Sequence, residues 1–361
     1  MYFMTRMSRY LLLLSVSVLL LLSCQDADRY VTVSGFAQGG TYRVTLNMRG
    51  VNATGAEVRK NVDAILQAVD NSLSGYNRNS LLSRFNAGEP VVPDSLFLEI
   101  YSFAYDIYRE TGGAVDVAGG PLFDLWGFGF RNGETPSEEE VERVVRECGM
   151  NRLLPDMRAA VREDGTVDGT SLLLCEKGRF TGIPPRPQLN YNAIAQGYSC
   201  DLVARYLYSV GVKDMMVDIG EIFCDGRNPS GKPWGIGIDR PVDGNDVPGA
   251  DIQGVFRVPA GPHGIVTSGN YRKFYVRDGK KYAHTIDPRT GRPVDHNLLS
   301  ATIVADDAVT ADAYATYCMV IGLEDAVDFL SSRTDLEGCL IYDDGGVFST
   351  WCSEGFVMEQ L

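Results

Sequence analysis

Segments with helical and with β-strand patterns follow one another irregularly along this chain, and no other feature restricts its fold as strongly. Strands and helices do not alternate regularly, and no linker separates two halves, so we expect one large domain or two closely packed ones. Apolar residues three and four positions apart predict helices over 54–73, 95–109, 137–148 and 194–210. Apolar and β-branched runs predict strands at 42–47, 215–219, 234–238, 254–258, 272–276 and 299–304.

The first residues carry the marks of an export signal with a lipidation site. Two arginines precede the run 11–22, which contains only Leu, Ser and Val, and Cys24 follows shortly after it. This run is too short for a helix that spans roughly 30 Å of hydrocarbon. We expect a lipoprotein signal peptide over 1–23, acylation of the Cys24 thiol and a tether over 24–35. A plain signal peptide with an incidental cysteine is the alternative, but no Ala-x-Ala cleavage site stands nearby.

The charge of the chain excludes some classes of partner. The formal net charge is −14 at pH 7. Nucleic acids and anionic lipid surfaces bind basic faces, so neither is expected as a partner. A ligand that carries phosphate would need a metal ion or a local cluster of donors.

The cysteines show no metal or redox spacing. The chain has 8 cysteines, and none of them form a CxxC pair. Most are expected to be small core residues. Cys339 and Cys352 flank a predicted hairpin around 343–346 and can come near each other, but the sequence leaves open whether they form a disulfide.

An aspartate and a threonine share one face of a further predicted helix over 310–321. Asp312 and Thr316 are four residues apart, and their oxygens are hard ligands of the kind that Mg²⁺ prefers. The alternative is local: Asp312 stabilises the helix N-terminus, and the Thr316 hydroxyl bonds to the carbonyl of residue 312.

His284 stands where a predicted strand runs into a Pro/Gly turn that carries Asp287 and Arg289. A histidine beside such a turn can accept a proton from a nucleophile. A lone histidine is just as often a structural residue, and this pattern alone does not decide between the two roles.

Several short blocks, in a specific order, resemble the ApbE family of FAD:protein FMN transferases. The resemblance covers nearly all of the chain after the signal. The blocks include Thr-Ser-Gly-Asn-Tyr-Arg at 267–272 and Thr-Ala-Asp-Ala-Tyr-Ala-Thr at 310–316. The others lie at 39–42, 73–76, 83–86, 113–116, 120–122, 125–129, 192–201 and 284–291.

This resemblance implies a single α+β unit over 36–361, with mixed or antiparallel sheets, flanking helices and a central FAD cleft. It implies that a divalent ion, Mg²⁺ or a similar metal, is held by Asp312, Thr316 and the backbone carbonyl of Ala193. His284 falls at the catalytic histidine of the family. The positions that line FAD are Gln38, Tyr76, Ala114, Val115, Asp116, Asn190, Gln196 and Ile286.

The implied activity is transfer of FMN from FAD to a Thr or Ser hydroxyl of another protein, with release of AMP. The implied acceptor is a membrane redox-complex subunit, which suits a lipid-anchored enzyme exported to face the periplasm of a bacterium. Two other functions remain open. They are a Mg²⁺-dependent FAD pyrophosphatase that yields AMP and FMN, and a non-catalytic flavin-binding lipoprotein.

Overall fold

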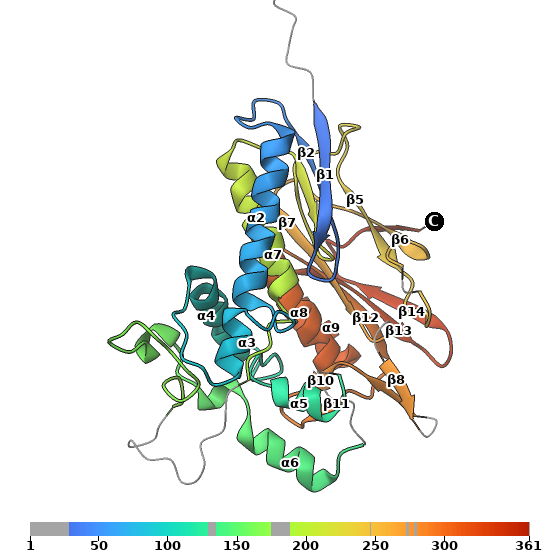
Figure 1. The fold of residues 1–361 in the computed structure, drawn as a ribbon. Helices are drawn as coiled ribbons and strands as arrows, with labels where there is room; N and C mark the ends of the chain where they lie inside the picture. Colours follow the sequence, from blue (N-terminus) through green and yellow to red (C-terminus); the bar gives the residue numbers. More distant parts are fainter. Residues whose placement is uncertain are drawn as a thin grey trace, which may run out of the picture.

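An antiparallel sheet of eight strands forms the centre of the molecule, in the order β1-β2-β3-β4-β7-β12-β13-β14 (Figure 1). The structure is a computed structural model that describes residues 29–128, 135–174, 188–245, 247–271, 274–277 and 280–360. The predicted signal peptide and Cys24 lie outside these residues. The strands are β1 Tyr30–Ala37, β2 Gly40–Asn47, β3 Met215–Asp218, β4 Ile222–Asp225, β7 His263–Gly269, β12 Leu298–Ala305, β13 Glu337–Asp343 and β14 Phe348–Cys352.

The first two strands form a hairpin with a turn of two residues. Ala37 pairs with Gly40, and the turn residues Gln38 and Gly39 have φ values of 52° and 80°. Positive φ at both positions is the requirement of the tight hairpin turn that matches strand twist. The strand β1 was not predicted, and it overlaps the tether expected over 24–35. The folded unit therefore begins at Tyr30, because β1 gains its stability from backbone pairing with β2 along its whole length.

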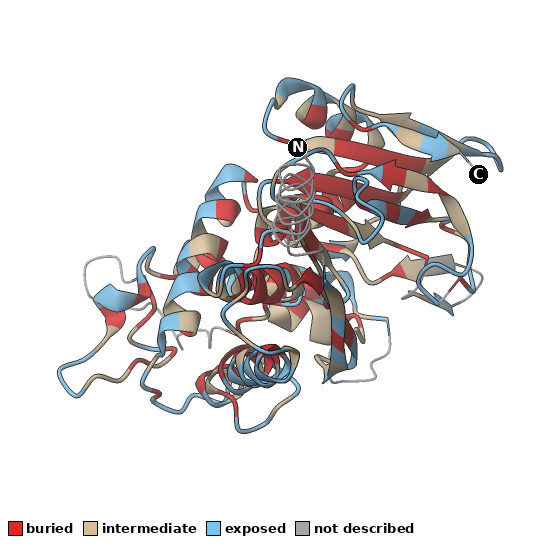
Figure 2. Cartoon of the chain, turned by 90° about the horizontal axis from the view of Figure 1, so that it is seen from above, coloured by how far each residue is buried: buried red, intermediate tan, exposed pale blue. Residues whose placement is uncertain are grey.

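Helices cover one face of this sheet. The helices α2 Gly55–Leu73 and α7 Ala195–Ser209 lie side by side across the first strands, and α8 Ala308–Ile321 continues the layer. Val44 of β2, Val62 of α2 and Val203 of α7 are fully buried in one apolar cluster. Figure 2 shows that buried residues concentrate in the strands and exposed ones on the outer sides of the helices.

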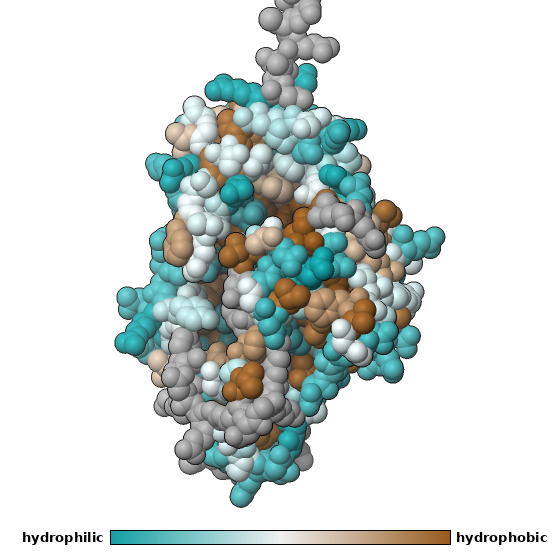
Figure 3. All heavy atoms as spheres, turned by 90° about the vertical axis from the view of Figure 1, so that its right-hand side faces the viewer, coloured by the Kyte–Doolittle hydropathy of each residue, from teal (hydrophilic) through white to brown (hydrophobic). Residues whose placement is uncertain are grey.

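A small sheet of three strands covers the opposite face. It has the order β15-β6-β5, with β5 Gly235–Asp239, β6 Ile252–Arg257 and β15 Met358–Gln360. Phe256 and Phe356 stack with ring centroids 4.2 Å apart and pack with residues of the large sheet in one apolar cluster. Figure 3 shows this side of the molecule, where hydrophilic residues surround smaller groups of hydrophobic ones.

The remaining elements form a lobe beside the end of the large sheet that carries α8 (Figure 1). A cluster of buried residues, including Phe97, Tyr191 and Tyr314, joins this lobe to α8. The elements are α3 Leu81–Asn86, α4 Ser95–Glu110, α5 Gly120–Leu125, α6 Glu138–Glu147, η1 Met150–Arg152, η2 Met157–Ala160, α9 Leu323–Ser332, β8 Phe274–Arg277, β9 Lys280–Ala283, β10 Ile286–Asp287 and β11 Arg292–Pro293.

The expected α+β class, with antiparallel sheets and flanking helices, is confirmed. The predicted helices of α2, α4, α6 and α7 agree with the structure to within one or two residues. The helix α8 starts two residues before the predicted Thr310, because the Asp307 side chain caps it by accepting the N–H of Thr310. Within the described ranges, no helix has both the length and the hydrophobicity needed to cross a membrane.

Candidate functional site

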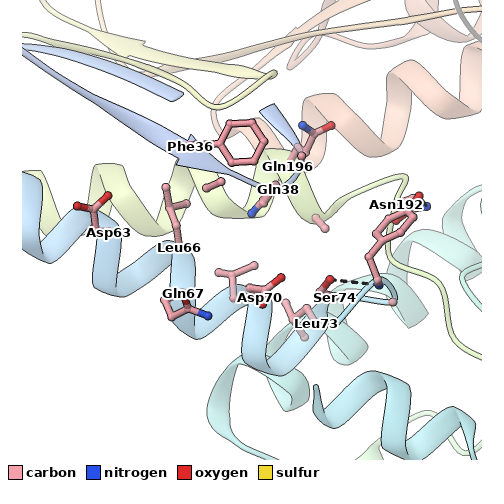
Figure 4. Close-up of a pocket in the computed structure, with 16 residues that line it drawn as sticks. Phe36, Gln38, Asp63, Leu66, Gln67, Asp70, Leu73, Ser74, Asn192 and Gln196 are labelled. Atoms are coloured by element: carbon pink, nitrogen blue, oxygen red, sulfur yellow. Dashed lines mark hydrogen bonds between the residues drawn. The ribbon is translucent and has the colours of Figure 1, made fainter. Parts of the chain in front are cut away.

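A cavity of about 970 Å³ opens between the β1–β2 turn, the C-terminal half of α2 and the N-terminus of α7. In Figure 4, side chains of α2 lie on one side of it, and Phe36, Gln38 and Gln196 lie on the other. Of the predicted FAD-lining residues, Gln38, Tyr76 and Gln196 line this cavity. The cavity is within the size range of small-molecule sites, which is about 300–1,000 Å³.

Two exposed aromatic rings belong to the lining of this cavity. Phe36 is 74% exposed and Tyr76 is 72% exposed, which is unusual for such large side chains. Exposed rings of this kind suit a flat ligand, since stacked aromatic pairs contribute about 0.5–1.5 kcal/mol beyond the area they bury. Sequence reasoning missed Phe36 because nothing in the alternation of β1 distinguishes it from other outward-facing residues.

The two glutamines fasten the start of α7 to neighbouring turns. Gln38 donates from Nε2 to the Ser199 hydroxyl at 2.5 Å, and Gln196 donates from Nε2 to the Ile219 carbonyl at 3.0 Å. Gln38 is the one non-glycine residue with positive φ in the part of the chain that the structure describes. Backbone strain of this kind concentrates at ligand sites.

The first turn of α7 has an irregular hydrogen bond that frees a carbonyl. In a regular helix the Gly197 N–H would donate to the carbonyl of Ala193, four residues earlier. It donates instead to Oδ2 of Asp312, at 3.1 Å. The Ala193 carbonyl accepts no backbone N–H from any residue that the structure describes. The Asp312 carboxylate thus takes the N–H that a helix carbonyl would accept at the start of α7.

The hydrogen bond from Gly197 to Asp312 depends on close packing of α7 against α8. A Cβ at Gly197 would lie 2.3 Å from the Ala308 carbonyl oxygen, so only glycine fits. Asp201, one turn further along α7, accepts the N–H groups of Ala308 and Val309 at 2.8 Å and 2.9 Å. Burial raises the pKa of Asp201 to about 7. Neither Asp201 nor Gly197 stands out in the sequence as a single candidate residue.

Asp312 is a buried carboxylate without a cationic partner among the described residues. Its side chain is 5% exposed, and burial raises its pKa, with the negative charge of Asp201 acting in the same direction. Thr316 lies one turn along the same helix, and its hydroxyl makes no hydrogen bond with the described part of the chain. One part of the local alternative is wrong, because Thr316 does not bond to the carbonyl of residue 312. Asp307 caps α8, and Asp312 acts instead at the N-terminus of α7, where it accepts the Gly197 N–H.

These three groups fit a small, hard cation by their chemistry. A carboxylate, a hydroxyl and a carbonyl are oxygen donors of the kind that Mg²⁺ accepts, together with waters and phosphates. Asp312 is buried and accepts only the Gly197 N–H, whereas Ala193 and Thr316 are half-buried. Within the described ranges, no cluster of three or more His, Cys, Asp or Glu side chains could hold a metal.

The five other predicted FAD-lining residues do not line this cavity. Asp116 accepts the N–H groups of Ala118 and Met150, and burial raises its pKa to about 6. Asn190 donates its N–H to the Val117 carbonyl at 2.7 Å. Its Oδ1 accepts the N–H of Asn192, which itself lines the cavity. Asn190 thus connects the segment of the buried Ala114 and Val115 and the half-buried Asp116 to the cavity wall.

The segment that carries the predicted catalytic residue His284 packs against Trp126 and against α8. Ile286 is buried in a cluster with Trp126, and Trp126 donates from Nε1 to the Gly291 carbonyl at 2.7 Å. His284 is half-buried, and its ring meets the Phe128 ring edge-on at 6.5 Å between centroids. Its neighbouring strand β10 contacts α8, which carries Asp312. His284 does not line the cavity.

Comparisons with known proteins agree on one family. The model of the ApbE family matches residues 38–340. The chain is 31% identical over 337 residues to the FAD:protein FMN transferase of Escherichia coli strain K12, covering 91% of this chain and 89% of that protein. It is 33% identical over 314 residues to the FAD:protein FMN transferase of Vibrio cholerae serotype O1, covering 85% and 86%.

Solved structures give the same result. The flavin transferase ApbE from Vibrio cholerae superposes with a TM-score of 0.73 at 30% identity, over 91% of this chain and 98% of that one. The apo form of the Pseudomonas stutzeri flavinyl transferase ApbE gives a TM-score of 0.74 at 29% identity, over 91% and 96%. The chain therefore belongs to the ApbE family, as the order of its motifs predicts.

Proposed function

We propose that this protein is an FAD:protein FMN transferase, which moves FMN from FAD onto a hydroxyl side chain of another protein. The observation that carries the proposal is the buried Asp312 carboxylate at the start of α7. It takes the Gly197 N–H, one residue after Gln196 of the cavity lining. A flavin store would not need a buried carboxylate without a cationic partner at the helix whose first turn lines the cavity. The relatives named for this reaction support the proposal.

We propose that Asp312, Thr316 and the Ala193 carbonyl hold Mg²⁺ or a similar divalent ion. The ion would neutralise charge on the pyrophosphate of FAD. A chain of net charge −14 is not expected to neutralise this charge with a basic surface. The negative charge that burial makes costly at Asp312 is then compensated by the cation.

In this proposal FAD extends from the cavity toward the Asp116 segment. Gln38, Tyr76 and Gln196 contact it in the cavity, and Tyr76 stacks on a flat ring. The other contacts with FAD are made where Asn190 continues the cavity wall. They come from Ala114, Val115, Asp116, Asn190 and Ile286.

The proposed reaction is a displacement at the phosphorus nearer riboflavin. The Ser or Thr hydroxyl oxygen of the acceptor forms a new bond to this phosphorus, the bridging P–O bond of the pyrophosphate breaks, and AMP leaves. His284 takes the hydroxyl proton, so charges and atoms balance. Positioning and charge neutralisation carry most of the catalysis in phosphoryl transfer.

We also propose that the protein is exported and held at a bacterial membrane, facing the periplasm, by acylation at Cys24. The motif around Cys24 supports this location. The acceptor is then a flavoprotein on the same side of the membrane, and we propose a subunit of a membrane redox complex.

The experiment combines the purified protein, FAD, Mg²⁺ and a candidate acceptor domain, and measures the intact mass of the acceptor. A gain equal to FMN that EDTA abolishes is the expected result. AMP and free FMN without a gain in acceptor mass would instead identify a pyrophosphatase. Binding of FAD without turnover would identify a carrier.

Substitution of the buried carboxylate tests the metal site. Asp312→Asn should remove Mg²⁺-dependent transfer, while the protein keeps a normal thermal melt because the variant buries an amide in place of a charge. Asp106→Asn, at an exposed position of α4, is the matched control and should keep full activity. Full activity in a folded Asp312→Asn protein would refute the metal assignment.

A further inference from the structure

We propose that Cys339 and Cys352 form a modification site, at which a disulfide ties the edge strand β14 to β13. The two residues are direct partners in the antiparallel register of these strands. Their Sγ atoms lie 2.9 Å apart as thiols. This site does not depend on flavin chemistry, so its test is independent of the proposed function.

The hydrogen-bond pattern of the hairpin shows that this is the closer type of cross-strand pair. Ser353 donates its N–H to the Gly338 carbonyl at 2.9 Å. Bonded and non-bonded pairs alternate along an antiparallel ladder, so the next pair, Cys339 with Cys352, is non-bonded. Such pairs have Cα atoms about 4.5 Å apart, which is inside the range of roughly 4.4–6.8 Å that disulfides need. The bond can therefore form without movement of the backbone.

The two thiols differ in access and acidity. Cys339 is fully buried, whereas Cys352 is half-buried. Their contact lowers the pKa of Cys352 and raises that of Cys339. Cys352 is thus the thiol that a solvent-borne oxidant reaches first, and the one that forms a thiolate more readily.

The oxidant required is a disulfide, either a small molecule or an oxidoreductase protein. The Cys352 thiolate attacks one sulfur of that disulfide, forms a mixed disulfide and releases one thiol. Cys339 then loses its proton, attacks the Cys352 sulfur and releases the second thiol. Two electrons and two protons pass from the pair to the oxidant, which is reduced to two thiols.

The position of the pair gives the bond a structural role. The strand β14 is the edge of the large sheet, and the chain after it carries Phe356 and β15 onto the opposite apolar face. A cross-link at Cys352 fixes this edge strand to β13 and anchors the start of the C-terminal segment. In the part of the chain that the structure describes, no other two cysteine sulfurs are in contact.

Trypsin provides a direct assay, because no Lys or Arg follows Arg333. The fragment 334–361 contains Cys339 and Cys352 and no other cysteine. The full-length protein is incubated with oxidised glutathione, alkylated and digested. The expected fragment carries no alkyl group and is lighter than the reduced fragment by two hydrogen atoms. Further cleavage at Tyr342 or Phe348 should leave two pieces joined until they are reduced.

Two alkyl groups on this fragment, or a glutathione adduct on Cys352 alone, would overturn the proposal. Cys352→Ser should abolish the oxidised fragment, and Cys148→Ser, at a buried cysteine of another cluster, should leave it unchanged. If the Cys352→Ser protein does not fold, alkylation of the unaltered protein still decides the question.

A thermal melt tests the structural role. The oxidised protein should melt at a higher temperature than the reduced one, because the bond restricts the unfolded chain. Cys352→Ser should show no difference between the two conditions. A melting temperature that oxidation leaves unchanged, despite complete formation of the bond, would refute the anchoring role.

Discussion

The two faces of the eight-stranded sheet are covered in opposite ways. On the face of β5, β6 and β15, stacked Phe256 and Phe356 seal the sheet with apolar side chains. On the helical face, α7 and α8 cross so closely that Gly197 touches the α8 backbone, and buried carboxylates meet helix N-termini there. The comparison shows that one face is sealed by apolar side chains, while the other holds buried carboxylates that accept helix N–H groups.

The largest expected effect concerns the sealed face. Phe356→Ala removes a buried ring and should lower the free energy of unfolding by about 3–5 kcal/mol. The rate of FMN transfer by protein that remains folded should not change. Val357→Ala, at the exposed neighbouring position, is the control and should stay within about 0.5 kcal/mol of the wild type in urea unfolding. A parallel loss of turnover in folded Phe356→Ala would show that the two faces are coupled.

The next effect concerns the helix crossing. Gly197→Ala places a Cβ 2.3 Å from the Ala308 oxygen, so the helices must move apart. Overpacking of this kind costs about 1–3 kcal/mol, and misplacement of Asp312 should reduce FMN transfer on the order of 100-fold. Gly55→Ala is the control, because that position of α2 faces open space. Equal turnover in both variants would show that the close packing of α7 against α8 does not affect catalysis.

A smaller effect should appear as a pH dependence of stability. Burial raises the pKa of Asp116 from 3.8 to about 6. Between these values the native carboxyl binds a proton that the unfolded chain lacks, so stability falls as pH rises from about 4 to above 6, by on the order of 2 kcal/mol. Urea unfolding of Asp116→Asn at pH 4.5 and 7 should lose this part of the dependence. An identical pH slope in the variant and the wild type would contradict it.

The smallest effect concerns the exposed ring in the lining of the cavity. Phe36→Ala should raise the KM for FAD by about two- to tenfold, the equivalent of one aromatic stacking contact. Stability should not change, because the ring is 74% exposed. Phe348→Ala, on the β13–β14 hairpin, is the control in the same steady-state assay. A KM that Phe36→Ala leaves unaltered would exclude this ring from flavin binding.

The helices were predictable, whereas much of the large sheet was not. In α2 and α7 the apolar residues recur three and four positions apart, so a single stretch of sequence shows the helical pattern. The strand β1 was missed because its pairing with β2 decides its state more than its own composition does. The short β4 and the buried β7 were missed for the same reason.

The candidate site shows the same division. Asp312 and Thr316 were predictable as oxygen donors because four-residue spacing places both on one face of a helix. The contact of Asp312 with Gly197 of α7, in place of the N-terminus of its own helix, was not predictable. It depends on Asp307 and Asp201, which accept the N–H groups at the N-terminus of α8. Asp201 lies 107 residues before Ala308, whose N–H it accepts.

The sequence by itself determined the family and the α+β class, because these follow from local spacing and ordered motifs. Only the tertiary structure decided that the Gly197 N–H leaves the Ala193 carbonyl for Asp312, 115 residues further along the chain. It also decided that the Cys339 and Cys352 sulfurs meet. The physical reason is that each group takes the partner that the packed chain brings within about 3 Å, and this partner is not set by distance along the sequence.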